Sequence, residues 1–220
     1  MEIILALDFD GTLYRLEEHD SEEMLMAVAA VSDEEKALMD ETIRNLRAGE
    51  NPRVFEEVLR DMLIGKPLDL IRKAVDKIIP LTDMNEMETV KRIVRRPNVH
   101  LHIVSCGTDM LVAEFLDRVG LLEYTEGIHA KELLHDDETF INFVWHITGP
   151  DDKRTAVLNL KRENPGCRLI SVGDGFTDGP MLSASDTGLL IELPGRAHHD
   201  MPFDRIKSYS ELISILDKQH

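Results

Sequence analysis

The chain has 220 residues, of which 43% are hydrophobic and 30% charged, a balance typical of a folded globular protein rather than a disordered one. Its 42 acidic and 25 basic residues give a formal net charge of −17, which argues against a surface that binds nucleic acid or an anionic membrane. An anionic substrate remains compatible with this charge if the pocket itself carries cations. The length suits one large domain, or a core domain with a smaller one.

The apolar segment near the N-terminus, residues 3–7, is too short for a signal peptide or a membrane span, and an acidic residue precedes it. Two cysteines, Cys106 and Cys167, predict no disulfide framework. We therefore expect a cytoplasmic protein that has neither a membrane nor a nucleic acid as partner.

The first regular element is expected to be a strand at residues 3–7, because its continuous apolar run is typical of a strand buried on both faces of a parallel sheet. From residue 17 to about residue 79 the apolar spacing becomes that of helices with charged outer faces, and glycines and prolines separate the segments. This block is predicted to contain about four helices and no strand, with the helices in 22–31, 34–49, 52–63 and 68–79.

Strand and helix patterns alternate after residue 81. Helices are expected in 85–96, 109–120, 152–164, 179–185 and 208–219, and strands in 99–105, 168–173 and 187–193, with a short strand or hairpin region through 128–134 and 139–147. Such alternation favours right-handed βαβ crossovers. The sequence thus predicts an α/β fold: a Rossmann-like parallel sheet core formed by residues 1–14 and 84–220, with an inserted all-helical cap at residues 15–83.

Polar residues directly follow three of the predicted strands, in the motifs "DFDGT" (8–12), "SCGT" (105–108) and "GDGFTD" (173–178). In open α/β sheets, ligands bind at the carboxyl ends of the strands. The side chains of these motifs are therefore expected to share one edge of the sheet: Asp8, Asp10, Ser105, Asp174 and Asp178. Such a group of carboxylates would repel itself at neutral pH without a cation, and carboxylate oxygens favour Mg²⁺ over zinc.

Lys153 begins a predicted helix in "GPDDKRTAV" and can reach this edge from one side. There it would neutralise Asp8 and stabilise a transferring phosphoryl group. Ser105 and the backbone N–H groups of the glycine-containing turn after it can hold phosphate oxygens, helped by the helix N-terminus that follows. Together these groups suit phosphoryl chemistry.

With these motifs present in order, the sequence resembles the haloacid dehalogenase superfamily, in its aspartyl-phosphatase branch. The four family motifs are matched by "DFDGT" (8–12), "IVSCGTD" (103–109), Lys153 and "GDGFTD" (173–178), and the resemblance covers essentially the whole chain. The helical insertion, including "RAGENPRVFEEVLRDML" (47–63), is similar to the small helical cap of the phosphoserine-phosphatase-like group.

The resemblance implies that Asp8 is the nucleophile, which attacks phosphorus and becomes an aspartyl phosphate. It implies that Asp10 protonates the leaving alcohol and then activates the water that hydrolyses the intermediate. It also implies that Asp8, the backbone carbonyl of Asp10 and Asp174 bind Mg²⁺, with Asp178 in or next to that shell.

For the substrate, the resemblance implies that Ser105 and Lys153 hold the phosphoryl oxygens, together with the phosphate loop formed by Cys106 and Gly107. Glu17 aligns with an acid of the cap hinge that phosphoserine phosphatases use for the substrate amine. The thiol of Cys106 is expected to be a small packed group rather than a nucleophile.

The presence of Asp10 favours a phosphatase or phosphotransferase, because the dehalogenases of the superfamily lack this acid and its P-type ATPases have threonine there. The expected function is Mg²⁺-dependent hydrolysis of a small phosphorylated metabolite, a phosphomonoester. Two alternatives remain: a phosphomutase of the same superfamily, and a catalytically silent regulatory binding protein. The sequence does not indicate the oligomeric state.

Three positions depart from the phosphoserine phosphatase pattern. Cys106 and Thr177 stand where those enzymes usually have Gly and Asn, and Met62 stands where they have the arginine that grips the substrate carboxylate. Losing a bidentate clamp of this kind should disfavour an α-carboxylate. We therefore expect phosphoserine to be a poor substrate, unless another arginine such as Arg60 has taken over the clamp.

Overall fold

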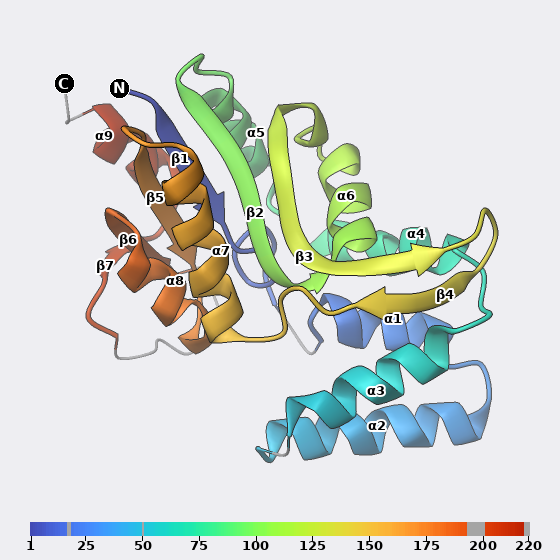
Figure 1. The fold of residues 1–220 in the computed structure, drawn as a ribbon. Helices are drawn as coiled ribbons and strands as arrows, with labels where there is room; N and C mark the ends of the chain where they lie inside the picture. Colours follow the sequence, from blue (N-terminus) through green and yellow to red (C-terminus); the bar gives the residue numbers. More distant parts are fainter. Residues whose placement is uncertain (17–18, 50, 193–200, 218–220) are drawn as a thin grey trace.

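A computed structural model describes residues 1–16, 19–49, 51–192 and 201–217 of the chain. Its centre is a seven-stranded sheet in the order β4-β3-β2-β1-β5-β6-β7 (Figure 1). The strands are β1 (Ile3–Leu7), β2 (Val99–Thr108), β3 (Thr125–His135), β4 (Phe140–Val144), β5 (Arg168–Gly173), β6 (Thr187–Ile191) and β7 (Asp204–Ile206). Neighbouring strands are parallel except β3 and β4, which pair antiparallel.

Strand β1 lies in the middle of this sheet, between β2 and β5. All five of its residues are buried, because helices cover both faces of the sheet. Ile3, Leu5 and Leu7 pack on one side, whereas Ile4 and Ala6 pack on the other. The continuous apolar run at 3–7 therefore reflects two apolar layers.

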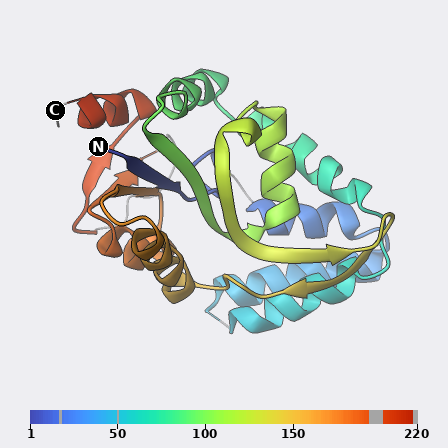
Figure 2. The same ribbon diagram turned by 45° about the horizontal axis from the view of Figure 1, so that its top comes forward.

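Five helices cover the two faces of the sheet: α5 (Met84–Val94), α6 (Asp109–Arg118), α7 (Pro150–Glu163), α8 (Gly179–Ala184) and α9 (Tyr209–Asp217). The buried side chains of α5, α6 and α9 join the layer of Leu5, and those of α7 and α8 join the layer of Ile4. Figures 1 and 2 show the two groups on opposite sides of the sheet. The predicted Rossmann-like α/β fold is confirmed.

Four helices lie between β1 and α5 along the chain: α1 (Ser21–Ala29), α2 (Asp33–Arg47), α3 (Pro52–Leu63) and α4 (Asp69–Ile78). Capping boxes begin the first two, with Asp20 and Ser32 as N-caps that accept hydrogen bonds from backbone N–H groups. The described part of residues 19–83 contains these helices and the short 3₁₀ turn η1 (Ile79–Leu81) but no strand, as predicted. Figure 1 shows α2 on the far side of α3 from the sheet, and α3 packs against β4.

The hairpin of β3 and β4 extends from the sheet to this helical block (Figure 1). Its turn pairs with the loop between α3 and α4: the Gly65 N–H donates to the Phe140 carbonyl at 2.9 Å, and the Phe140 N–H donates to the Lys66 carbonyl at 3.0 Å. The short strand or hairpin region expected through 128–134 and 139–147 is a hairpin, formed by the eleven-residue β3 and the five-residue β4. Backbone pairing thus joins the helical block to the core at a point far from residue 15.

Three further elements differ from the sequence prediction. Strand β7 has only three residues, too few for the alternation that indicates a strand, and it was not predicted. The 3₁₀ turns η2 (Leu122–Tyr124) and η3 (Phe176–Asp178) were not predicted either. Among the described residues, no helix has the length and apolar character required to cross a membrane.

Candidate active site

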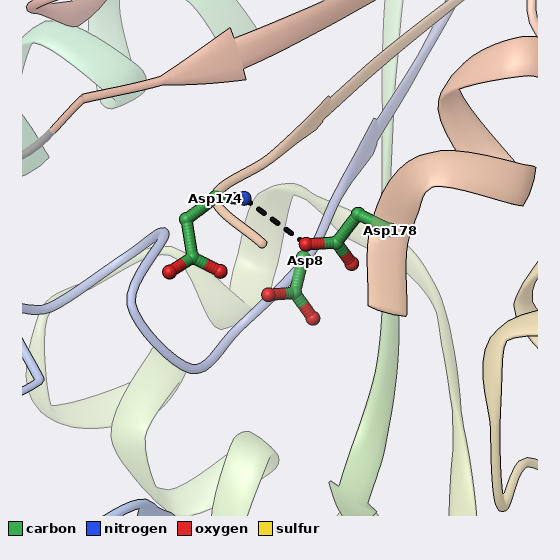
Figure 3. Close-up of side chains that lie close together, drawn as sticks. All are labelled: Asp8, Asp174 and Asp178. Atoms are coloured by element: carbon green, nitrogen blue, oxygen red, sulfur yellow. Dashed lines mark hydrogen bonds between the residues drawn. The ribbon is translucent and has the colours of Figure 1, made fainter. Parts of the chain in front are cut away.

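Three carboxylates from two adjacent strand ends meet at the carboxyl edge of the sheet. Asp8 directly follows β1, Asp174 directly follows β5, and Asp178 ends η3. One oxygen from each lies within 4.8 Å of the others, and all three residues are buried (Figure 3). Sequence reasoning brought the same three residues together from the strand ends.

Lys153, in the first turn of α7, enters the same cluster from the side. Its Nζ lies 2.5 Å from Asp8 Oδ1 and 2.7 Å from Asp178 Oδ1, and the side chain is almost fully buried. Burial lowers the pKa of Lys153, but the two carboxylates outweigh this effect and the pKa rises above its ordinary value. Lys153 is therefore a permanent ammonium at this position.

Within these four residues, formal negative charge exceeds formal positive charge. Three carboxylates and one ammonium sum to −3 + 1 = −2 in a buried place. Burial, followed by the neighbouring Asp178 charge, raises the pKa of Asp8 to about 7, although Lys153 opposes the shift. A divalent cation would remove this imbalance, and three carboxylate oxygens are the donors that Mg²⁺ prefers. The residues present thus fit Mg²⁺.

The spacing of "GDGFTD" has a structural reason. The Asp178 Oδ2 atom accepts hydrogen bonds from the backbone N–H groups of Asp174 and Gly175, both at 3.0 Å, so the motif folds back on itself (Figure 3). A Cβ at Gly173 would lie 2.4 Å from Asp178 Cγ, so only glycine fits there. In the turn after β1, the Thr12 hydroxyl donates to Asp8 Oδ2 at 3.2 Å.

Ser105, Cys106 and Gly107 form an irregular part of β2 rather than the turn that the sequence suggested. Pairing with β3 shifts between Val104 and Thr108, where β2 carries extra residues opposite β3. Ser105 is fully buried, and its Oγ accepts a hydrogen bond from the Gly107 N–H at 2.9 Å. Burial raises the pKa of the Cys106 thiol to about 12, which suits a packed group and not a nucleophile.

Asp10 is held apart from the three-carboxylate group. Its Oδ1 accepts hydrogen bonds from the Tyr14 hydroxyl and from the Ser21 N–H at 2.7 Å, and its Oδ2 accepts one from the Ser21 hydroxyl at 3.0 Å. The metal role expected for Asp10 concerned its backbone carbonyl, so this geometry leaves that role a prediction. Since Ser21 is the first residue of α1, the second acid of "DFDGT" contacts the helical block.

Two other predicted residues, Glu17 and Met62, and two residues that the sequence analysis missed complete the description. Glu17 lies outside the described residues. Met62 is buried in the same apolar cluster as Phe55 of α3. The sequence analysis missed Tyr14 and Ser21 as partners of Asp10. The only signal for Tyr14 was its place four residues after Asp10, and the only signal for Ser21 was its place at the start of a capped helix.

Comparisons with known proteins identify the family of this chain. The sequence of residues 5–183 matches the haloacid dehalogenase-like hydrolase family. No curated protein sequence matches the chain.

Solved structures share the fold at low sequence identity. A haloacid dehalogenase family hydrolase from Salmonella enterica subsp. enterica serovar Typhi has a TM-score of 0.76 and 17% identity, over 99% of this chain and 72% of that one. A substrate-bound phosphoserine phosphatase has a TM-score of 0.67 and 20% identity, over 99% and 98%. A phosphoserine phosphatase with a phospho-aspartyl intermediate analogue has a TM-score of 0.61 and 22% identity, over 86% of each chain. From the match over residues 5–183, this chain belongs to the haloacid dehalogenase-like hydrolase family.

Proposed function

We propose that the protein is a Mg²⁺-dependent phosphatase that hydrolyses a small phosphomonoester through an aspartyl phosphate on Asp8. The observation that carries this proposal is the buried cluster of Asp8, Asp174 and Asp178, whose oxygens lie within 4.8 Å of one another, with Lys153 bound to Asp8. One carboxylate can then act as nucleophile while the others hold a cation, and the ammonium faces the incoming phosphate.

In the first step, an Asp8 carboxylate oxygen attacks phosphorus, and the bond between phosphorus and the leaving oxygen breaks. Asp10 gives its proton to that oxygen, so the product leaves as an alcohol. Ser105, Lys153 and the N–H groups of Cys106 and Gly107 hold the phosphoryl oxygens, where negative charge accumulates.

In the second step, Asp10 takes a proton from water, and the resulting hydroxide attacks phosphorus of the aspartyl phosphate. The bond from phosphorus to the Asp8 oxygen breaks, which restores the carboxylate and yields inorganic phosphate. The bonds from Tyr14 and Ser21 to Asp10 support this role, because they fix the orientation of the acid that transfers both protons.

Mg²⁺ would be held by Asp8, Asp174 and the backbone carbonyl of Asp10, with Asp178 in or next to that shell. When bound, it supplies positive charge beside the transferring phosphoryl group. The net charge of −2 among the three carboxylates and Lys153 supports this assignment.

The helical block would act as a cap over this site, with residues 15–83 as the inserted part and residues 1–14 and 84–220 as the core. The contact of Ser21 with Asp10 supports it, because the first residue of α1 touches the acid that would protonate the leaving group. Closure of such a cap excludes water from the first step.

A phosphate-release assay tests the proposal. Purified protein is incubated with a panel of phosphorylated amino acids, sugars and small alcohols, with Mg²⁺ or with excess EDTA, and free phosphate is measured. We expect release with Mg²⁺ and at least about a 100-fold loss with EDTA. Full activity in EDTA would contradict the metal role. Conversion of a sugar phosphate without free phosphate would indicate the phosphomutase, and no turnover of any compound would indicate the silent binding protein.

Metal binding has a readout that does not depend on turnover. Mg²⁺ should raise the midpoint of thermal unfolding of the wild type, since a ligand of the folded state stabilises it. The same addition should have a much smaller effect on Asp174→Asn. An equal shift in both proteins would contradict the predicted metal site.

A further inference from the structure

A second buried lysine lies beside the catalytic cluster, on the hairpin strand β3. Lys131 is fully buried, and its Nζ lies 2.6 Å from Glu22 Oε2 of α1 and 2.7 and 2.9 Å from the two carboxylate oxygens of Glu56 of α3. Three oxygens thus surround the ammonium, one for each of its N–H groups. Lys131 has no donor left for another anion.

Two buried polar atoms next to Lys131 make no hydrogen bond within the described part of the chain. They are Glu22 Oε1, on a residue that is 6% exposed, and the hydroxyl of Thr108, which is 0% exposed. Thr108 of β2 is the register partner of Lys131 of β3, and Glu22 binds the Lys131 ammonium, so both unsatisfied atoms belong to residues that neighbour this lysine. Buried polar atoms are nearly always paired in native proteins, and an unpaired one calls for a ligand or a solvent molecule.

Chain neighbours of both atoms touch the catalytic residues. Glu22 follows Ser21, whose hydroxyl donates to Asp10, and Thr108 follows Gly107. The position of a Cβ at Gly107 would be 3.2 Å from Ser105 Oγ, 3.2 Å from Ser21 Oγ and 3.6 Å from Asp10 Oδ2. The residues that carry the unsatisfied atoms are therefore the chain neighbours of Ser21 and Gly107, which lie beside the groups that would hold the phosphate and protonate the leaving oxygen.

Two further observations concern the place of the lysine cluster: its electrostatic effect on Cys106 and a cavity beside Glu56. Burial raises the pKa of the Cys106 thiol; Asp8 and Glu22 raise it further, whereas Lys153 and Lys131 lower it, so groups of both clusters act on this thiol. On the outer side, Glu56 lines a cavity of about 530 Å³ between α3 and the segment after β4, together with Trp145 and Pro150. The lysine cluster thus acts on the same thiol as the catalytic groups, and one of its members, Glu56, lines a cavity.

We infer that Glu22 Oε1 and the Thr108 hydroxyl form the leaving-group end of the substrate pocket, and that they select leaving groups that carry a hydrogen-bond donor and no carboxylate. This inference rests on the proposed phosphatase function. Two carboxylates and one ammonium give the cluster a formal charge of −2 + 1 = −1, so it attracts donors and cations and repels anions. An ammonium and a hydroxyl both offer the required donor.

The cluster also ties β3 to α1 and α3, and a purely structural tie is the competing explanation. A tie accounts for the three contacts of Lys131. It does not account for the unpaired atoms of Glu22 and Thr108, each of which destabilises the folded state unless a partner arrives.

A substrate series separates the two explanations in the wild-type protein. Alkyl monophosphates of two, three and four carbons are compared, in which the far carbon carries an ammonium, a hydroxyl, a methyl or a carboxylate. At one chain length or more, we expect an ammonium- or hydroxyl-ended substrate to be preferred. Its kcat/KM should exceed the kcat/KM of the methyl-ended substrate and that of the carboxylate-ended substrate of the same length by about 10-fold or more. Turnover without such a preference at any length overturns this inference alone. No turnover of any compound overturns the proposed function as well.

Variants then assign the preference to the two atoms. Glu22→Met and Thr108→Val should reduce the ratio of kcat/KM between donor-ended and methyl-ended substrates to within about 3-fold of unity, since the acceptor is removed. Glu22→Gln keeps an acceptor without its charge, so it should reduce an ammonium preference more than a hydroxyl preference. This ratio is unaffected by loss of folded protein, which lowers the rate for all substrates alike.

The control is Glu35→Gln, which changes a glutamate of α2 that also binds a lysine, Lys66, at 2.6 Å. Its ratio should equal that of the wild type. An unchanged ratio in Glu22→Met and Thr108→Val would overturn the inference and leave the cluster as a structural tie. A ratio that fell equally in Glu35→Gln would also overturn it.

Discussion

Lys153 and Lys131 are both buried lysines that bind two carboxylic residues each, but their partners come from different parts of the fold. Lys153 binds Asp8 and Asp178, which follow core strands. Lys131 binds Glu22 and Glu56, which belong to two helices of the inserted block. The first cluster includes a third carboxylate, that of Asp174, and the second includes an unpaired oxygen of Glu22.

This difference indicates different tasks. The four core residues Asp8, Asp174, Asp178 and Lys153 have a formal net charge of −2 at one edge of the sheet, which a divalent cation would offset. A cluster with a net charge of −1 that joins the hairpin to two helices lacks one hydrogen-bond donor, which a leaving group can supply. Chemistry would then depend on the core cluster, and the choice of substrate on the cluster shared with the helical block.

The largest effect is expected from the core cluster. Asp8→Asn removes the nucleophile, so phosphate release should fall by about 10⁴-fold or more. The fold should remain, because the change removes one of three mutually repelling buried carboxylates. Phosphate release and the midpoint of thermal unfolding are measured together.

The matched control is Asp69→Asn on the surface of α4, whose carboxylate binds Lys73 four residues later. Its activity should stay within about 2-fold of the wild type, since exposed ion pairs contribute little. Residual turnover of Asp8→Asn above about 1% of the wild type would contradict the assignment of the nucleophile.

The second prediction concerns stability and the other cluster. Lys131→Met leaves Glu22 and Glu56 buried without their cation, which should lower the free energy of unfolding at pH 7 by about 3–5 kcal/mol. Lys66→Met breaks the half-exposed pair with Glu35 and should cost less than about 1 kcal/mol. Denaturant unfolding measures both, and equal losses would contradict the difference in burial.

The loss of unfolding free energy in Lys131→Met should depend on pH in a definite direction. Burial already raises the pKa of Glu22 and of Glu56 despite Lys131, and removing the ammonium raises both further. A folded-state pKa above the unfolded value means that the folded variant binds more protons than the unfolded chain as the pH falls. The deficit of Lys131→Met should therefore shrink between pH 7 and pH 5. A deficit that grew over this range would contradict the burial of the two carboxylates.

The two clusters also differ in how far the sequence predicts them. Asp8, Asp174 and Asp178 follow predicted strands, and parallel strands end at the same edge, so their meeting could be inferred. Lys131 lies inside β3, and its partners lie on helices whose packing depends on the long hairpin. Helical periodicity placed Glu22 and Glu56 on helices, but it did not indicate which face of each helix meets the sheet. The same limit applied to Tyr14 and Ser21, whose bonds to Asp10 depend on where α1 docks.

The smallest effect on activity is expected at Asp10, where the core touches the helical block. Tyr14 is buried, with ring centroids 5.3 Å from Phe9 and 6.1 Å from Phe115, so Tyr14→Phe keeps the aromatic packing and removes only the hydroxyl. Burial, followed by the Asp10 charge, raises the pKa of Tyr14 well above its ordinary value, so at neutral pH the hydroxyl is protonated and donates to Asp10. Its loss leaves Asp10 with two donors from Ser21, at 2.7 and 3.0 Å, so orientation is weakened rather than lost.

We therefore expect Tyr14→Phe to lower kcat by about 3- to 10-fold, the value of one hydrogen bond, with KM nearly unchanged. Ser21→Ala, which removes the hydroxyl donor but keeps the N–H donor, should have an effect of similar size. The double variant should lose more than either single one, because Asp10 then keeps one donor of three. A fall in thermal stability with kcat unchanged would show that Tyr14 serves packing alone. If instead KM rose and kcat did not change, the bonds to Asp10 would act in substrate binding and not in proton transfer.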